Sequence, residues 1–441
     1  MARHAKEQFM HYLGIDVHKK VVAACLLDED GQIVKRARFD LSAQRLSAFI
    51  GSLPHPCKVV LEATTNTWAV VDVLTPLVDE VVVSNPMRTK AIASAKIKCD
   101  RVDALVLAQL LRTDFLPRVW QPDAATRQAR ALAHRRSVLV RDRTRLKNRI
   151  HSLLAQRLIV APACLFSYAA RQWLAELSLP PCARGELDTL LVLLDTIEKE
   201  ISQLQQPIDQ LAWNDPAVRL LMTLPGVNVT VAQGLIAAIG DIDRFRTPAH
   251  LAAYLGLVPS THQSAEHCYH GPITKHGNSQ ARWLLSEAAQ CVASHPGPLG
   301  HFFRKLATRK HRNVAVIATA RKLAEIAWHM LIKNEPYRYA TPQATADKLA
   351  RLRVSVTGCR RRSSTKGQPR SPYYGTADPS RPVKSLPEVL QSESLPAMQP
   401  LAPGEVRMLQ DSHCLPWQQS LQQPSRRPGV RKARKPPHPS D

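Results

Sequence analysis

The sequence predicts an α/β domain at the N-terminal end, a helical region after it and a disordered basic tail. Three observations support this prediction. Short apolar runs separated by turn residues occupy residues 10–120 and end in a helical repeat. Apolar residues then recur at helical spacing as far as residue 335. Over residues 336–441, proline, serine, arginine and glutamine dominate and the periodicity ends.

Residues 10–120 contain the segments from which the α/β domain is predicted. The runs YLGIDV and VVAACLL, the turn DEDG and the run QIVKRARF indicate an antiparallel meander. KVVLEA at 58–63 is a continuous apolar run typical of a central strand, and EVVVS indicates another strand before Pro86. The segment KIKCDRVDALVLAQLLRTDF at 96–115 places its leucines at helical spacing and predicts a helix.

Residues 121–215 predict two long helices. The first, over 122–160, has an apolar stripe from Leu132 to Leu153 and is rich in arginine and lysine elsewhere. The second repeats apolar residues in steps of three and four, which forms a heptad seam of Leu187, Leu190, Leu194, Ile197, Ile201, Leu204, Ile208 and Leu211. Pro207 is expected to kink it. The pair predicts an antiparallel coiled-coil hairpin, which would serve as a dimerisation arm or spacer, or be a plain helix pair packed on its own domain.

Residues 216–335 predict a mostly helical domain. LPGV places Pro225 and Gly226 between two helical segments, as in a helix-hairpin-helix motif, where backbone N–H groups at the start of the second helix face a phosphate. The same turn also joins ordinary core helices. In the predicted tail, RRR at 360–362 and RRPGVRKARK near the end suit non-specific contacts with a polyanion, or serve only as solvated charge.

Composition bounds the class of protein. The 441 residues call for two or three domains. The net charge of +24 favours a nucleic acid as partner, and because residues 341–441 hold 17 basic and seven acidic residues, most of this charge lies elsewhere. No apolar run approaches the ~20 residues that cross a bilayer, so no membrane partner is expected. No secretion signal is visible, and nine cysteines without a C-x-x-C pair indicate a reducing compartment.

Four carboxylates stand out against this basic background. Asp100 and Asp103 share one face of the helix predicted at 96–115, either because acids are favoured at a helix start or because they bind a divalent metal. Asp16 lies within the apolar run YLGIDV, where a lone buried carboxylate is costly, and Glu62 ends the run KVVLE. An Asp on the first strand, a Glu on the fourth and two Asp on a following helix is the order of the RNase H-like (RuvC-like) nuclease fold. Four carboxylates could hold two Mg²⁺ ions about 3.5–4 Å apart.

A zinc site is a weaker alternative. Cys268 lies close in sequence to four histidines, but the spacing matches no common zinc finger. These histidines are His262, His267, His270 and His276. No zinc is therefore expected.

The longest motifs resemble a known family. YLGIDVHK, LEATTN and NPMRTKAIASAKIKCDRVDALVLAQLL are similar to the N-terminal half of an IS110-family transposase, with its DEDD RuvC-like domain. LPGV, GDIDRF, HLAAYLGLVPS, GPITKHGN and ARWLLSEAA resemble the IS116/IS110/IS902-type C-terminal transposase domain. The resemblance covers residues 11–335 in order, and the tail has no counterpart in it.

This resemblance implies two sets of catalytic residues. The DEDD carboxylates that bind Mg²⁺ would be Asp16, Glu62, Asp100 and Asp103. A catalytic serine precedes the motif G-x-I-x-K-x-G-N, and counting back from Gly271 assigns Ser264. Gln263 and Ala265 depart from the serine and glycine of the family pattern, so Ser260 and Ser279 are the alternatives. Lys275 and Arg282 flank the segment and could hold phosphate oxygens, or be solvated surface cations.

The resemblance also implies a mechanism and partners. Ser264 would form a covalent phosphoserine link to DNA, with the serine of one subunit meeting the carboxylates of another in a dimer or tetramer. A structured non-coding RNA would pair with both target and donor DNA, and the enzyme would act at the nucleoid in the bacterial cytoplasm. Two alternatives need no serine: a hydrolytic RuvC-like structure-specific nuclease, and a nucleic-acid-binding protein without enzymatic activity.

Overall fold

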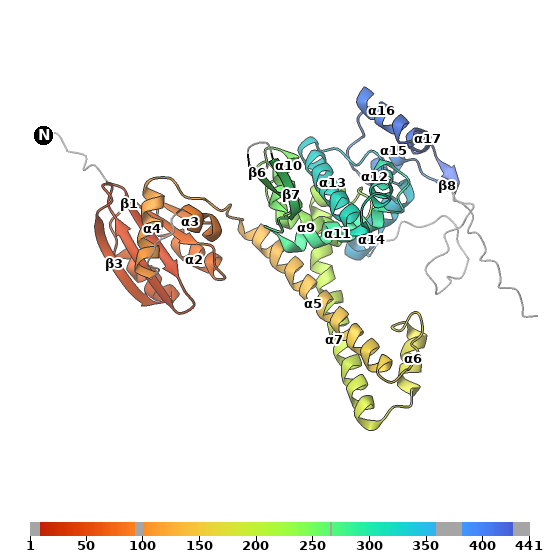
Figure 1. Ribbon diagram of the computed structural model, residues 1–441, viewed down its shortest axis with the longest axis horizontal. Helices are drawn as coiled ribbons and strands as arrows, with labels where there is room; N and C mark the ends of the chain where they lie inside the picture. The colour runs from red at the N-terminus through yellow and green to blue at the C-terminus, as the bar shows by residue number, and fades with distance from the viewer. Residues whose placement is uncertain (1–8, 93–99, 265–266, 359–381, 427–441) are drawn as a thin grey trace, which may run out of the picture. The chain divides into compact units, whose positions relative to one another are not determined.

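The computed structural model of the chain describes residues 9–92, 100–264, 267–358 and 382–426 (Figure 1). Its contacts divide the chain into two compact units, residues 1–123 and residues 124–441. Each unit has its own hydrophobic core. None of the helices in the described part of the chain is both long enough and apolar enough to span a membrane.

The N-terminal unit is built on a five-stranded sheet with the strand order β3-β2-β1-β4-β5. Strands β1 (His11–Val17), β2 (Val21–Leu27) and β3 (Ile33–Asp40) form the predicted antiparallel meander. Strand β4 (Cys57–Glu62) runs parallel to β1, and β5 (Glu80–Ser84) runs parallel to β4. The predicted α/β class of this unit is confirmed, and its mixed sheet is consistent with an RNase H-like domain.

Helices cover both faces of this sheet. Helices α1 (Ala43–Gly51) and α2 (Thr67–Leu74) pack on the face to which Leu13, Ile15, Val59 and Leu61 point. Helix α4 (Asp100–Arg112) packs on the opposite face (Figure 1), and α3 (Pro86–Ile92) follows β5. Because side chains alternate along a strand, Asp16 and Glu62 fall on the α4 face.

Gly14 lets α4 come unusually close to β1. A Cβ atom at residue 14 would lie 2.1 Å from the carbonyl oxygen of Ala104 and 2.6 Å from the amide nitrogen of Ala108. Both neighbours are backbone atoms, so they cannot move aside as a flexible side chain would. Ala104 and Ala108 are themselves small and fully buried. The absence of a side chain at residue 14 therefore sets the distance between α4 and the central strand.

We expect Gly14→Val to open this contact. Overpacking a core costs roughly 1–3 kcal/mol, and a clash with backbone belongs at the upper end. Hydrogen–deuterium exchange of β1 and α4 in the intact chain measures the loss. The control is Gly51→Ala, whose new methyl group would meet no atom within 4 Å. If the amides of β1 and α4 were equally protected from exchange in the two variants, Gly14 would not be the packing constraint.

The C-terminal unit begins with two long helices. Helix α5 (Ala124–Ala155) and helix α7 (Pro181–Asn214) run antiparallel (Figure 1), and the ion pairs Lys147–Glu198 at 3.0 Å and Arg135–Glu200 at 3.1 Å link them. The short helix α6 (Tyr168–Glu176) packs where they are joined. Most of the predicted seam is buried, and α7 continues through Pro207. That the pair is a coiled coil remains a prediction.

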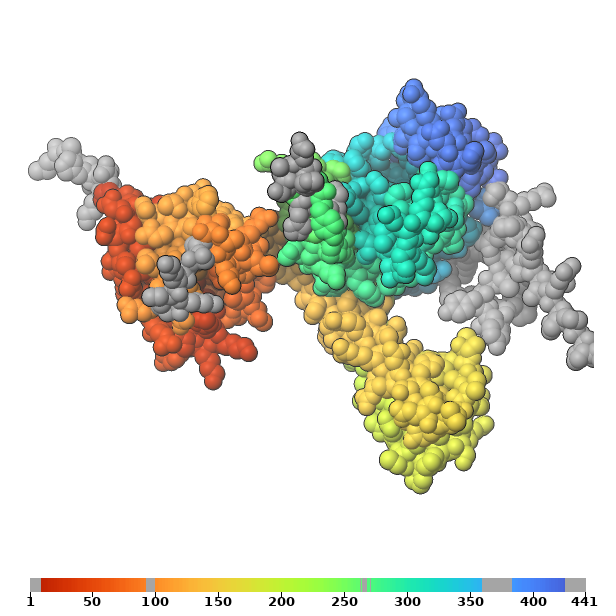
Figure 2. All heavy atoms as spheres, viewed as in Figure 1, coloured from red at the N-terminus to blue at the C-terminus, as the bar shows by residue number. Residues whose placement is uncertain are grey.

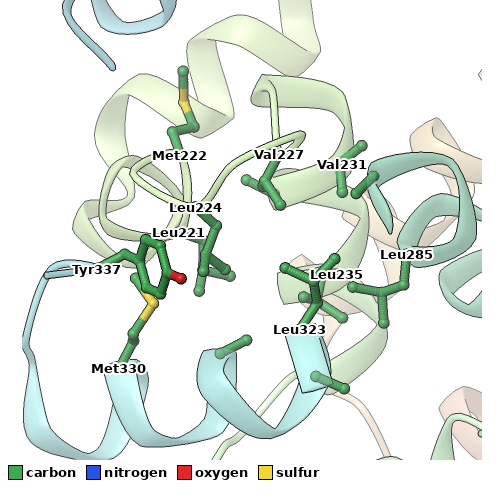
Figure 3. Packing of buried hydrophobic residues seen from close by; sticks show 14 of the residues in the cluster. Leu221, Met222, Leu224, Val227, Val231, Leu235, Leu285, Leu323, Met330 and Tyr337 are labelled. Atoms are coloured by element: carbon green, nitrogen blue, oxygen red, sulfur yellow. The ribbon is translucent and has the colours of Figure 1, made fainter. Parts of the chain in front are cut away.

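The rest of this unit is helical around one large core (Figure 3). A two-stranded hairpin of β6 (Pro259–Ser264) and β7 (His267–Ile273) interrupts the helices, and the sequence patterns did not predict it. The helices are α8 (Pro216–Leu221), α9 (Val229–Ile239), α10 (Pro248–Tyr254), α11 (Ser279–Val292), α12 (Pro298–Ala307) and α13 (Arg312–Lys333).

The LPGV turn between α8 and α9 is part of this core. Gly226 has a φ of +73° and packs so closely that a Cβ would lie 2.3 Å from the carbonyl oxygen of Ala288. The Lys348 ammonium donates to the carbonyl oxygens of Leu224 at 2.7 Å and Val227 at 2.9 Å. These contacts fix the turn within the core, and phosphate binding by Pro225 and Gly226 remains a prediction.

The expectation that residues 336–441 are disordered is wrong for most of that segment. Helices α14 (Pro342–Thr357), α15 (Leu386–Ser392), α16 (Pro403–Asp411) and α17 (Leu415–Ser420) contribute to the core of the C-terminal unit, and β8 (Pro382–Val383) pairs with β9 (Ser425–Arg426). Figure 2 shows the blue residues near the C-terminal end lying against the rest of this unit. Each helix has a proline in its first turn, where its missing N–H costs nothing. The prolines of this segment therefore begin helices, and a proline-rich composition does not indicate disorder here. RRR at 360–362 and nearly all of RRPGVRKARK lie outside the described residues.

His295 joins this C-terminal extension (residues 382–426) to the helical core of the C-terminal unit. Its Nδ1 accepts a hydrogen bond from the Gly297 amide at 3.2 Å, and its Nε2 lies 3.2 Å from the Thr341 hydroxyl. The indole ring of Trp417 meets the imidazole edge-on at 5.4 Å. Burial, helped by the positive charge of Lys348, lowers the pKa of His295 to about 4.

We expect this histidine to make the C-terminal unit sensitive to acid. An unfolded histidine binds a proton near pH 6.5, whereas folded His295 stays neutral down to about pH 4. The contribution of His295 to the free energy of unfolding is therefore complete above pH 6.5. It is lost as the pH falls from 6.5 to about 4, by roughly 3 kcal/mol in total. Urea unfolding at a series of pH values measures it. The variant His295→Asn, which cannot titrate, should lose this part of the slope; an unchanged slope would contradict the assignment.

Candidate active site

The first two carboxylates come from neighbouring parallel strands. The register pairs Ile15 of β1 with Leu61 of β4, so Asp16 and Glu62 are the next residues along their strands. Both point to the α4 face, and neighbouring strands lie about 4.8 Å apart. Strand pairing thus brings together two acidic side chains that are 46 positions apart in the sequence.

The other two carboxylates come from the first turn of α4. Ala104 and Ala108 are fixed against Gly14, so the turn that precedes them lies over Asp16, two residues further along β1. Burial raises the pKa of the Asp16 carboxyl; the charges of Asp103 and Asp100 raise it as well, while His18 lowers it. The structure therefore brings Asp16, Asp100 and Asp103 within electrostatic reach of one another, and register adds Glu62.

His18 is a further member of this site that the sequence patterns missed. Its Nε2 lies 3.1 Å from Oδ2 of Asp16 and 3.3 Å from Oδ1 of Asp100. Arg38 of β3 approaches the other oxygen of Asp100 at 3.9 Å. The signal in the sequence is the spacing D-x-H, because residues two apart at a strand end share a face. It is a weak signal, since every pair of residues two apart in a strand shares a face.

The donor set fits a divalent cation. Asp16, His18 and Asp100 each offer a ligand atom, and these atoms lie within 4.8 Å of one another. Asp16 is largely buried, whereas Asp100 and His18 remain open to solvent on one side. Carboxylates held this close repel one another unless a cation lies between them. A cluster with a closed protein side and an open solvent side can bind a metal and still admit a phosphate.

The proposed nucleophile lies in the C-terminal unit. Ser264 is the last residue of β6, in register with His267 of β7, and it precedes residues 265–266, which lie outside the described residues. It therefore belongs to a strand of the β6–β7 hairpin. The alternatives differ in their surroundings. Ser260 donates its hydroxyl to the carbonyl of Pro272 at 3.2 Å, and Ser279 is the exposed first residue of α11.

The two flanking cations have different environments. The Arg282 guanidinium donates to the carbonyl oxygens of Leu255 and Lys275, both at 3.2 Å, and so ties the α10–β6 loop to the β7–α11 loop. Lys275 itself is exposed, with a φ of +56°. Arg282 thus holds the loops that carry the hairpin, and Lys275 presents its charge to solvent.

A mixed sheet that is consistent with an RNase H-like domain and carries carboxylates on one face is typical of enzymes that process nucleic-acid strands. The comparisons identify the branch of this class. Residues 13–158 match the DEDD transposase family of the IS110 type, and residues 218–304 match the transposase IS116/IS110/IS902 family. The chain therefore belongs to the IS110 family of transposases.

Curated relatives agree with these matches. The chain is 28% identical to a probable family 20 transposase of Pseudomonas aeruginosa, over 74% of this chain and 98% of that protein. It is 27% identical to the transposase for insertion sequence element IS1111A of Coxiella burnetii, over 74% of this chain and 91% of that protein. A pilin gene-inverting protein of Moraxella bovis is 24% identical, over 74% of this chain and 97% of that protein.

Proposed function

We propose that this transposase cuts and rejoins DNA at the ends and the target of an insertion sequence, with Mg²⁺ at the carboxylate cluster and a serine as nucleophile. The observation that carries the proposal is the convergence of Asp16, Asp100 and Asp103 on one face of the sheet, with Glu62 next to Asp16 in register. Hard carboxylate oxygens are the ligands that Mg²⁺ prefers, and these four residues would hold two ions. The inversion of DNA named for the Moraxella bovis relative supports a recombination reaction.

Ser264 is the proposed nucleophile. Its Oγ forms a bond to the phosphorus of a DNA strand and its proton passes to water. The bond from phosphorus to a deoxyribose oxygen breaks, and that oxygen takes up a proton. A serine hydroxyl is a weak nucleophile at neutral pH, and bound Mg²⁺ would supply the charge stabilisation that this step needs. Because one phosphoester replaces another, the strand can be rejoined without ATP.

The main alternative is a hydrolytic RuvC-like nuclease. It uses the same carboxylates, but water attacks the phosphorus and no bond to the protein forms. The two functions therefore differ in one observable, a covalent adduct between protein and DNA. A binding protein without activity would give neither an adduct nor cleavage.

The test uses the full-length protein, Mg²⁺, labelled DNA of the element junction and RNA transcribed from the flanking non-coding region. We expect a protein–DNA adduct on a denaturing gel with the wild type and none with Ser264→Ala. Asp103→Asn should abolish cleavage, with a loss of at least a hundredfold, and leave DNA binding nearly intact, because it removes one ligand charge without changing shape.

Matched controls separate the outcomes. Ser260→Ala and Ser279→Ala should retain the adduct if Ser264 is the nucleophile. An adduct that survives in Ser264→Ala moves the assignment to one of these serines. Cleavage without any adduct favours the hydrolytic nuclease, and full activity in Asp103→Asn contradicts the metal site.

We also propose that the enzyme acts as a homo-oligomer with a structured guide RNA. The exposed side chains Arg141, Arg145 and Arg149 recur every four residues on α5, so they form one basic stripe, and Lys275 adds a cation beside the hairpin. Such a surface suits phosphates, as it would in DNA or A-form RNA.

We expect the triple variant Arg141→Gln, Arg145→Gln, Arg149→Gln to weaken RNA binding at least tenfold and to lower its salt dependence by about three counterions. A filter-binding titration at several salt concentrations measures both values, and light scattering gives the mass of the complex. Unchanged RNA affinity would exclude this stripe, and a monomer that still exchanges strands would exclude the oligomer.

A further inference from the structure

We propose that His18 completes a mixed nitrogen–oxygen metal site with Asp16 and Asp100, and that this site prefers a transition-metal dication such as Mn²⁺ over Mg²⁺. The inference rests on the metal site of the proposed function and adds to it a ligand and a metal preference. It is carried by the geometry around one ring nitrogen.

The distances around His18 match those between ligands of one ion. In an octahedral site with bonds of about 2.1–2.2 Å, neighbouring ligand atoms lie roughly 3.0–3.1 Å apart. Nε2 of His18 is 3.1 Å from Asp16 Oδ2 and 3.3 Å from Asp100 Oδ1. Nε2 carries at most one proton, which cannot point along both lines at once. A dication at the centre of these three atoms satisfies all of them.

The backbone holds His18 in this position. Its amide donates to the carbonyl of Val21 at 2.9 Å, which closes the turn between β1 and β2. Asp16 precedes it on β1, and Asp100 is held by the packing of α4 on Gly14. The three ligand atoms therefore come from two elements whose spacing is set by backbone contacts. The imidazole remains half-exposed, so a metal can enter from solvent.

A nitrogen ligand changes which metal the site prefers. Mg²⁺ binds almost only oxygen, whereas imidazole nitrogen favours the first-row transition metals in the order of their general affinity. A set of carboxylates with one imidazole should therefore still accept Mg²⁺ but bind Mn²⁺ more tightly. Because the DEDD residues are all oxygen donors, His18 is the side chain that would introduce this difference.

The same contacts allow an opposite role, which the test must separate. His18 could act only as a hydrogen-bond partner that fills the cation's place between Asp16 and Asp100. In that case its removal would free the carboxylates and tighten metal binding. A ligand and a competitor thus predict changes of opposite sign.

The experiment is a titration of the full-length protein with Mn²⁺, followed by the electron paramagnetic resonance of the free ion, with and without competing Mg²⁺. We expect the wild type to bind Mn²⁺ at least tenfold more tightly than Mg²⁺. His18→Ala should lose about tenfold in Mn²⁺ affinity and little in Mg²⁺ affinity. Spin-echo modulation from a directly bound ¹⁴N should be present in the wild type and absent from His18→Ala.

Two further variants make each outcome decisive. His55→Ala is the matched control, because His55 is equally exposed but faces a single carboxylate, Asp79, at 3.9 Å. Asp16→Asn tests the metal site itself. Binding of Mn²⁺ that depends on Asp16 but not on His18 overturns the inference alone, as does tighter binding in His18→Ala. If Asp16→Asn binds metal as tightly as the wild type, the metal site of the proposed function is overturned as well.

Discussion

The close contact between α4 and β1 at Gly14 is the constraint on which the candidate active site depends. Because Gly14 has no side chain, the backbone of α4 can lie directly against β1. Ala104 and Ala108 have small side chains, so they also allow this short distance between helix and strand. Once Ala104 and Ala108 are fixed there, the first turn of α4 must lie over the end of β1. Asp100 and Asp103 then face Asp16 whatever their mutual repulsion. Core packing thus holds carboxylates together that would otherwise separate, and this stored repulsion favours a cation.

The electrostatics of the chain work on two scales. Over the whole protein, a net charge of +24 attracts a polyanion. Within the N-terminal unit, a small cluster of negative charge repels the phosphates that the rest of the chain attracts. His18 and Arg38 reduce this local charge from the protein side, and a metal ion would reverse it. A phosphodiester at this cluster would therefore need a cation beside it, which under the proposed function couples DNA binding there to the metal.

The C-terminal extension lies beyond both family matches. The matched relatives are covered almost whole, yet they account for only 74% of this chain, and the second family match ends at residue 304. The extension nevertheless shares the core of the C-terminal unit. Arg338 binds Glu405 at 2.5 Å, and Arg353 binds Glu393 at 2.8 Å. Its short helices gain their stability from this packing rather than from their own length, as is usual for helices of two or three turns.

The α/β class of the N-terminal unit, the two long helices and the four candidate carboxylates could be predicted from the sequence, because each prediction rests on a local pattern or a family motif. Apolar alternation defines strands, and steps of three and four define helices, without reference to distant residues. The β6–β7 hairpin and the extension escaped this reasoning: the first is polar, and the second combines prolines with sparse apolar residues. Tertiary structure alone decided that Gly14 brings α4 onto β1, that Arg282 ties two loops together and that His18 joins Asp16 and Asp100. These contacts join residues brought together by strand pairing and helix packing, and no periodicity along the chain records such distances.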